Sequence, residues 1–295
     1  TGRQHEQSGE REGERGSVGG HGGQESTWAS RTERPPRRQA AGAVDTDLPA
    51  VGYHNVVRSD SIVADTQEAN FPASNLANPA THLEWRAADD SEQYITITTN
   101  EVDPIDYVGI ARHNLGTAEI VVSVEANIDS VWTEIVEETM LPDDTPAVLR
   151  FAAASYSQVR IRLQTGSDTA RIAVVYCGKL LDLERKVYVG HTPLPYARKI
   201  DVASNRSVSG NFLGRIILGE GRESTVPFSL FTPAWCRENL DPFLEAAEGI
   251  PFFFAWRPNT YPREVGFCDL MADPMPAPAG PSNLIAFDLK LNGVA

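Results

Sequence analysis

The residues of this sequence that could do chemistry are few and scattered. Six histidines and three cysteines are spread over 295 residues, and none stands at the i, i+4 or Cys-x-x-Cys spacing that a zinc site uses. The glycines of Gly214–Gly221 lack the strand–GxGxxG–helix and GKS/T patterns that cradle phosphate, so they indicate a turn or bulge between strands. No Gly-x-Ser-x-Gly motif occurs. We therefore expect a protein that is not an enzyme and that holds no cofactor or catalytic metal.

Two pairs of carboxylates come nearest to a binding constellation. Asp89–Asp90 and Asp143–Asp144 each fall in a predicted turn. Calcium takes oxygen ligands of this kind, but adjacent aspartates are equally what a solvated turn carries. The solvated turn is the simpler interpretation, so neither pair is assigned as a metal site.

The composition indicates an acidic protein with no membrane-spanning segment. No apolar run approaches the roughly 20 residues that cross a bilayer, and the first forty residues lack the apolar centre of a signal peptide. The net charge is −14, and residues 1–44 carry seven basic and six acidic side chains, so the rest of the chain carries about −15. Such a body disfavours non-specific binding of nucleic acid, which needs positive surface. It fits a surface along which DNA could slide without sticking.

Three regions follow one another along the chain. Residues 1–50 form an arm dominated by Gly, Arg, Glu, Ser and Gln, which cannot bury enough apolar surface to order alone; it would order only against a neighbouring subunit. Residues 51–183 alternate as strands, for example in 94–98 and 159–163, with turns between them. About eight short strands of this kind predict a sandwich or jelly roll. Trp85 and Trp132 are expected in its core.

A resemblance appears at the start of this second region. The segments Phe71–Pro79 (FPASNLANP) and Thr81–Arg86 (THLEWR) resemble the opening of discoidin (coagulation factor 5/8 type C) and galactose-binding-like domains, and the later strands follow in the expected order. The resemblance covers most of residues 55–181. It implies a sandwich that binds glycans or lipid head groups through loops at one end. The candidates for such a glycan loop are His82, Arg86, His113 and Asn114.

The third region, 184–295, is organised around the stretch Pro233–Arg263. Apolar residues at helical spacing predict a helix over 233–248, with Gly249 at its C-terminus in the positive-φ conformation. The apolar run Phe252–Trp256 predicts a strand that is covered on both faces, or on one face with a neighbouring subunit on the other. The residues expected to build the domain core and the contacts between copies are Trp235, Phe243, Leu244, Phe252, Phe253, Phe254, Trp256, Pro258 and Tyr261.

Residues 186–295 resemble the distal tail protein of long, non-contractile bacteriophage tails, including the minor tail protein M type of lambda. The resemblance rests on the helix with Phe243-Leu244-Glu245, the aromatic strand with Pro258 and Tyr261 after it, and the final strand Ala286–Leu291. It implies a tail-tube-like β-sandwich or barrel with one flanking helix, and hence a mainly β chain with two β domains. Segments 185–196 and 274–281 would contact neighbouring copies.

The second resemblance implies a structural role in a virion. By this resemblance, the chain would form a homo-oligomeric ring, a hexamer, that joins the tail tube protein to the tail hub and tip proteins at the distal end of a phage tail. The tape measure protein and a host cell-surface carbohydrate are further expected partners, and phage DNA would pass through without specific binding. Such a protein is made in the host cytoplasm and does not insert into a membrane.

Two alternatives remain open at this point. The first is a carbohydrate-binding module of a surface or secreted protein, with the C-terminal region an accessory β domain. The second is an enzyme such as a glycan hydrolase whose catalytic carboxylates lie in loops, against which stands the lack of any catalytic pattern.

Overall fold

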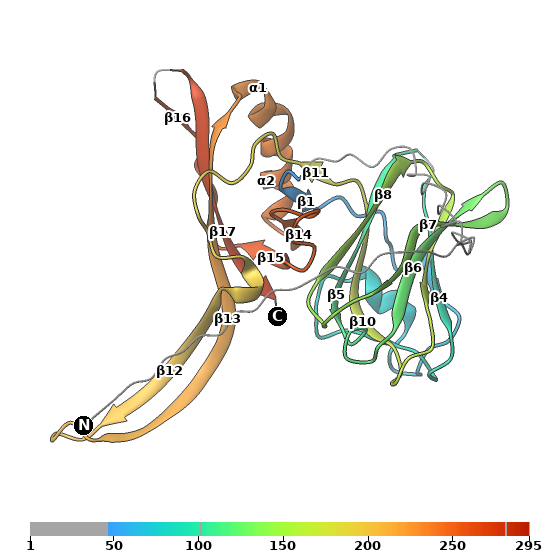
Figure 1. Cartoon of the computed structure of the whole chain (residues 1–295), viewed down its shortest axis with the longest axis horizontal. Helices are drawn as coiled ribbons and strands as arrows, with labels where there is room; N and C mark the ends of the chain where they lie inside the picture. The colour runs from blue at the N-terminus through green and yellow to red at the C-terminus, as the bar shows by residue number, and fades with distance from the viewer. Residues whose placement is uncertain (1–46, 101, 281, 295) are drawn as a thin grey trace, which may run out of the picture. The chain divides into compact units, whose positions relative to one another are not determined.

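The computed structural model describes residues 47–100, 102–280 and 282–294, and these residues are mainly β. Almost all of the predicted arm falls outside them, so its ordering stays a prediction. All of the described residues belong to one compact unit. Within this unit the chain first builds a sandwich and then a separate, larger sheet (Figure 1).

The sandwich consists of two antiparallel sheets. One has the strand order β3-β10-β5-β8 and the other the order β2-β4-β9-β6-β7. The strands of the first sheet are β3 (Trp85–Arg86), β5 (Ile105–His113), β8 (Ala147–Ala154) and β10 (Arg171–Gly178). Those of the second are β2 (Ile62–Ala64), β4 (Gln93–Thr98), β6 (Val121–Ile128), β7 (Val131–Met140) and β9 (Gln158–Leu163). A 3-10 helix, η1 (Ala73–Ala77), precedes β3.

Alternate apolar side chains along the strands point into the space between these sheets and fill it. In β4, Ile95 and Ile97 are fully buried while the residues between them face outward, as a period of two requires. Trp85 is fully buried, and its Nε1 donates to the carbonyl oxygen of Thr66 at 3.0 Å. Trp132, in contrast, is not in the core: it is half-buried on β7, where the guanidinium of Arg160 stacks over its ring at 4.3 Å.

The larger sheet is antiparallel, in the order β11-β1-β14-β15-β17-β13-β12, with β16 paired to β17. Its strands are β1 (Ala50–Gly52), β11 (Leu181–Asp182), β12 (Arg198–Arg206), β13 (Phe212–Phe231), β14 (Phe252–Ala255), β15 (Val265–Leu270), β16 (Ala277–Ala279) and β17 (Leu284–Val294). A 3-10 helix, η2 (Leu194–Tyr196), precedes β12. In the part of the chain that the structure describes, β11 and β12 do not pair with each other, so the sheet is open and the predicted barrel does not close.

One helix flanks this sheet, close to its predicted span. It runs through α1 (Pro233–Trp235), the π-helical turn η3 (Cys236–Leu240) and α2 (Asp241–Ala247). The π turn directly precedes Pro242, which has no N–H and whose ring would crowd the carbonyl four residues earlier in a regular α-helix. Gly249 follows the helix, but it does not take the predicted positive φ.

Strand β14 is buried on both faces, and the same chain covers both. Phe252 and Phe254 pack with the helix, and the rings of Phe243 and Phe252 lie 5.0 Å apart. On the other face Phe253 packs against residues of the sandwich, among them Tyr176, whose ring lies 5.5 Å away. A Cβ added to Gly109 would come within 2.6 Å of the Phe253 ring, so β5 and β14 approach closely.

The strands β12 and the first half of β13 leave the sheet as a two-stranded ribbon, visible in Figure 1. The sequence predicted a turn or bulge between strands at Gly214–Gly221, whereas β13 runs through these residues, with a register shift against β12. The turn of the ribbon is closed by hydrogen bonds between Ser207 and Asn211, with Gly210 at φ 85°. Every residue of β12 is exposed, and so are five large apolar residues in the adjoining half of β13: Phe212, Leu213, Ile216, Ile217 and Leu218.

The three cysteines are free and buried, as the sequence predicted. Burial raises the pKa of the Cys177 thiol to about 12, which keeps it protonated and unreactive. Among the described residues, no helix has the length and apolar character needed to cross a membrane.

Candidate saccharide site

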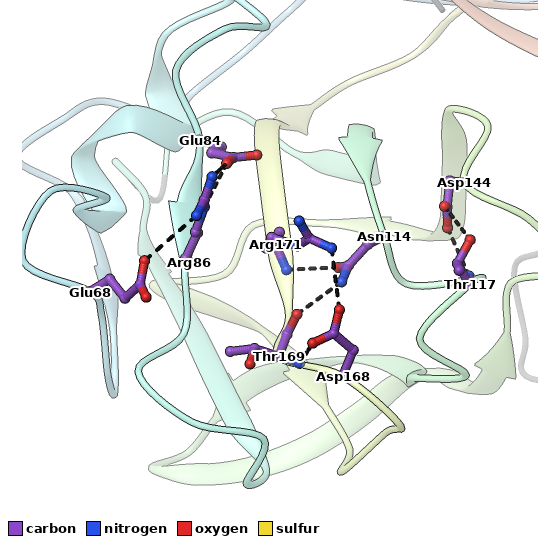
Figure 2. A network of polar contacts seen from close by, with 9 residues as sticks. All are labelled: Glu68, Glu84, Arg86, Asn114, Thr117, Asp144, Asp168, Thr169 and Arg171. Atoms are coloured by element: carbon purple, nitrogen blue, oxygen red, sulfur yellow. Dashed lines mark hydrogen bonds and ion pairs between the residues drawn. The ribbon is translucent and has the colours of Figure 1, made fainter.

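The candidate site lies at one end of the sandwich, where strands of the four-stranded sheet meet the loop after β5. In register, Arg171 of β10 pairs with Arg86 of β3, and Ile172 pairs with His113 of β5. The strand ends therefore bring two arginines, a histidine and the following loop to one edge. Figure 2 shows the polar side chains of this edge.

Asn114 ties the loop after β5 to the start of β10. Its Nδ2 donates to the carbonyl oxygen of Thr169 at 2.9 Å, and its Oδ1 accepts from the backbone N–H of Arg171 at 2.8 Å (Figure 2). The side chain is buried, and its two hydrogen bonds take the place of those that a neighbouring β-strand would form with this backbone. Its role here is to hold the backbone, and the guanidinium of Arg171 remains partly exposed next to Asp168 at 3.3 Å.

His113 is also occupied by the protein itself. Its Nδ1 accepts from the backbone N–H of Leu115 at 3.2 Å, so Nε2 carries the proton and donates to the carbonyl oxygen of Thr145 at 3.0 Å. Burial lowers the pKa of His113 in spite of the nearby carboxylates of Asp144 and Asp143. The neutral ring therefore links the loop after β5 to the loop before β8.

Arg86 sits in a small ionic group beside β3. Its Nε donates to Glu84 Oε1 at 2.6 Å, and a second carboxylate, that of Glu68, lies 3.9 Å from Nη1. The guanidinium also stacks over the ring of Phe71 at 3.8 Å. Two carboxylates and the ring of Phe71 thus hold the guanidinium of Arg86 in position at this edge.

A pocket of about 450 Å³ opens at this edge. Polar residues of the sandwich line one side, and residues of η2 and the larger sheet line the other. The lining residues from the sandwich are Glu84, Arg112, His113, Asn114, Asp144, Thr145, Pro146 and Arg171, and the others are Leu194, Pro195, Arg222, Val265, Gly266 and Gly293. This volume lies within the range of about 300–1,000 Å³ that small-ligand sites occupy.

Of the four residues that the sequence proposed for a glycan loop, the structure brings His113 and Asn114 together in this pocket. Arg86 lies on β3, which β10 separates from β5, and it is not among the lining residues. His82 is exposed on the turn before β3. The sequence reasoning did not single out Arg112, Arg171 or Arg222. Asp144 was noted only as a turn carboxylate; it caps the loop by accepting from the Thr117 N–H at 2.9 Å.

The residues proposed for the core and for contacts between copies lie mainly inside the C-terminal part. Phe243, Phe252, Phe253 and Phe254 are buried, whereas Trp235 and Leu244 are partly buried against the same cluster. Trp256 is half-buried and stacks on the exposed Tyr261 with ring centroids 5.2 Å apart, and Pro258 lies half-buried in the turn between them.

Among the described residues, no group of three or more His, Cys, Asp or Glu side chains could hold a metal ion. What the arrangement offers instead is a set of fixed hydrogen-bond donors and acceptors around a hollow.

Neither a protein-family model nor a curated protein sequence matches this chain. Solved structures that are similar include chitosan-binding module 1 of a chitosanase/glucanase from Paenibacillus sp. IK-5, with a TM-score of 0.38 and 18% identity over 42% of this chain and 98% of that one. The family 32 carbohydrate-binding module of Clostridium perfringens NanJ, solved with galactose, gives 0.37 and 16% over 43% and 98%. A module of the same kind from AlyQ, in complex with 4,5-unsaturated mannuronic acid, gives 0.35 and 20% over 43% and 96%. At these values the likeness does not establish what this chain binds.

Proposed function

We propose that this chain is a saccharide-binding protein and that the pocket beside Asn114 and Arg171 holds the sugar. The observation that supports this most is the convergence of planar polar groups from separate strands and loops on one hollow. Guanidinium, amide and carboxylate groups offer paired donors and acceptors, which suit the neighbouring hydroxyls of a sugar ring. The discoidin-like pattern of residues 55–181 points the same way.

The loop that carries this pocket is already ordered before any ligand arrives. Asn114 and His113 form buried hydrogen bonds to the backbone of the neighbouring segments, and Asp144 holds Thr117. A ligand therefore does not have to order this loop, which reduces the entropic cost of binding. A weak site of this kind gains affinity when several copies are linked.

A glycan array probed with the full chain tests the proposal, followed by calorimetric titration of the saccharides retained. We expect Asp144→Asn to weaken binding, because the amide has one acceptor oxygen where the carboxylate uses two to hold Thr117, so the pocket loop is less firmly fixed. Asp129→Asn is the matched control, since Asp129 lies in the turn between β6 and β7, away from the pocket. Retention of no saccharide, or equal loss in both variants, would contradict the proposal.

The ribbon of β12 and β13 favours a second function, which is assembly with other copies of the same chain. An isolated two-stranded ribbon is at best marginally stable in water, and this one exposes large apolar side chains, with Ile216 at 67% and Leu218 at 70% exposure. Contiguous apolar surface of this kind marks an interaction site. β12 is also the last strand of the sheet, so its outer edge is open to a strand from a second copy.

The finer form of this second function is the distal adaptor ring of a bacteriophage tail, joining the tail tube to the tail hub around the DNA channel. Its supports are the resemblance of residues 186–295 to distal tail proteins and the ribbon, which could reach a neighbour in a heterologous contact that closes as a ring. In that setting the sandwich would present the saccharide site to a host surface, repeated once per subunit.

Light scattering after size-exclusion chromatography, with negative-stain images, tests the assembly. We expect rings from the unaltered chain, and monomers when Leu213, Ile216 and Leu218 are changed together to serine. The control changes three exposed valines of the sandwich, Val63, Val102 and Val131, to serine. A chain that stays monomeric at high concentration would refute self-assembly and leave the saccharide proposal standing.

A further inference from the structure

The charge of the pocket differs from that of the chain as a whole. Three arginines line it, Arg112, Arg171 and Arg222, against two carboxylates, Glu84 and Asp144, although the chain carries a net charge of −14. Positive side chains gathered in one hollow of an acidic protein favour an anion there.

The two carboxylates offset this charge only in part. Glu84 forms its hydrogen bond and ion pair with Arg86, at 2.6 and 2.5 Å, and Arg86 itself lies outside the lining. Asp144 accepts from the N–H and the hydroxyl of Thr117, at 2.9 and 2.5 Å, and is not within ion-pair distance of an arginine among the described residues.

Two arginines of the wall, Arg171 and Arg222, in contrast, keep much of their charge. Arg171 pairs with Asp168 at 3.3 Å, but both side chains are more than 40% exposed, and exposed pairs of this kind contribute little. Arg222 donates to the neutral carbonyl oxygen of Pro195 and forms no ion pair within the described residues. Its guanidinium therefore brings an uncompensated positive charge to the side of the pocket opposite Arg171.

Arg112 adds a conformational observation. Its φ is 54°, in the left-handed region that non-glycine residues seldom adopt. It lies directly before His113 and Asn114, whose buried hydrogen bonds fix the loop. Backbone strain that the surroundings enforce is typical of ligand sites, and here it occurs at one of the three arginines.

The lining also lacks the other common means of holding a sugar. Among its described residues, none is Phe, Tyr or Trp, and the imidazole of His113 is buried in hydrogen bonds to the protein. Recognition then depends on hydrogen bonds and charge, and guanidinium groups bind carboxylates through paired, charge-assisted hydrogen bonds.

We propose that the pocket selects a carboxylated saccharide, such as a polymer or oligomer of uronic acid, with Arg171 and Arg222 contacting its carboxylates from opposite walls. This inference rests on the proposed saccharide function and specifies its ligand class. The carboxylate supplies the negative charge, and the ring hydroxyls meet other polar groups of the lining, while Asn114 and Asp144 hold the backbone in place.

Titration of the full chain with trigalacturonate, and in parallel with the neutral galactotriose, tests the inference. We expect trigalacturonate to bind at least about tenfold more tightly, and the difference to shrink as salt rises from about 0.05 to 0.5 M, because added ions screen the contact. Arg171→Gln and Arg222→Gln should each weaken trigalacturonate binding about tenfold, while Arg206→Gln at the far end of the ribbon leaves it unchanged. Circular dichroism verifies that the variants fold, and the salt series needs no variant.

The outcomes separate this inference from the function on which it rests. Equal affinity for both trisaccharides, with no effect of salt, would overturn the inference and support the broader saccharide proposal. Binding of neither trigalacturonate nor any other saccharide would overturn both. Binding of trigalacturonate that inorganic sulfate displaces at equal concentration would overturn selection of a sugar and reduce the pocket to a general anion site.

Discussion

Three polar side chains that line the pocket use their hydrogen bonds on the protein. Neutral His113 joins two loops, Asn114 substitutes for a strand, and Asp144 caps Thr117. The guanidinium groups of Arg171 and Arg222 are then the charged groups that remain to contact a ligand in the pocket. His113, Asn114 and Asp144 thus fix the backbone around the pocket, and the arginines supply its positive charge.

The stability of the fold should depend on pH through His113. An unfolded histidine has a pKa of about 6.5, and burial lowers the pKa of His113 below that. Above about pH 6.5 both states are neutral. As the pH falls below it, the unfolded chain takes up a proton that the folded chain does not, so the free energy of unfolding falls by up to about 1.4 kcal/mol per pH unit.

We expect His113→Gln, which keeps a donor for Thr145, to reduce this slope by up to about one proton between roughly pH 6.5 and 5. Urea denaturation at several pH values measures it. His82→Gln, at an exposed histidine, serves as the control and should leave the slope as it is. An unaltered slope in His113→Gln would show that the residue titrates freely in the folded protein.

Gly109 gives a second test at this scale. The contact of its Cα with the Phe253 ring leaves no room for a methyl group, whose carbon would lie 2.6 Å from the ring. We expect Gly109→Ala to lower the free energy of unfolding by about 1–3 kcal/mol, the usual cost of overpacking. Gly190→Ala is the matched control, because a Cβ there meets no atom within 4 Å. Equal stability of the two variants would mean that the contact is loose.

Only part of the candidate site could be predicted from the sequence. His113 and Asn114 were found because an exposed-looking His-Asn pair follows an apolar strand. Arg171 and Arg222 were missed because each reads as the polar position of an alternating strand. Nothing local indicates that the start of β10 and the middle of β13 line one pocket; that depends on tertiary packing.

At the level of elements, the flanking helix shows which local signals are reliable. Its start, its apolar face and its approximate end followed from spacing, since Leu240, Phe243 and Ala247 are all buried. The π turn before Pro242 was not predicted, and neither was the conformation of Gly249. Both depend on how the backbone relaxes around the packed face.

The cap of this helix should contribute measurably to stability. The Trp235 N–H donates to Thr232 Oγ1 at 3.3 Å, and loss of such a cap costs about 0.5–2 kcal/mol. We expect Thr232→Ala to lower the midpoint of urea denaturation accordingly, whereas Thr232→Ser, which keeps the hydroxyl, should retain most of it. A serine variant as weak as the alanine variant would assign the effect to the lost methyl group.

The ribbon was the element least accessible to sequence reasoning. Its register shifts between Asp201 and Val202, which breaks the alternation, and its glycines resemble turn signals. The pattern therefore predicted a turn or bulge between strands at Gly214–Gly221, and the resemblance to distal tail proteins placed the contacts between copies at 185–196 and 274–281 instead. Most strands of the sandwich, by contrast, have a regular period and a buried face, and the sequence located them within a few residues.

At the scale of the whole molecule, the aromatic strand β14 joins the two parts of the chain. We expect Phe253→Asp to place an unpaired carboxylate between β14 and the sandwich, which is strongly unfavourable in a buried site. The larger sheet should unfold or lose assembly, while the sandwich, with its own core, stays folded. Limited proteolysis with mass spectrometry should then release a protected fragment that contains residues 55–178. Native particles from this variant would show that Phe253 is not needed for the larger sheet to pack against the sandwich.

The pairing of β1 with β11 has a topological consequence. Val51 lies opposite Leu181 and Ala50 opposite Asp182, so the chain leaves the larger sheet and returns to it at neighbouring positions. The entire sandwich is thus the loop of a β-hairpin at one edge of the sheet, which continues beyond β1. Because the cost of closing a loop grows only slowly with its length, a module at this position can be exchanged, enlarged or deleted while the two anchoring strands remain paired. Ligand recognition could therefore change by replacement of the whole sandwich between β1 and β11, while the larger sheet stays the same.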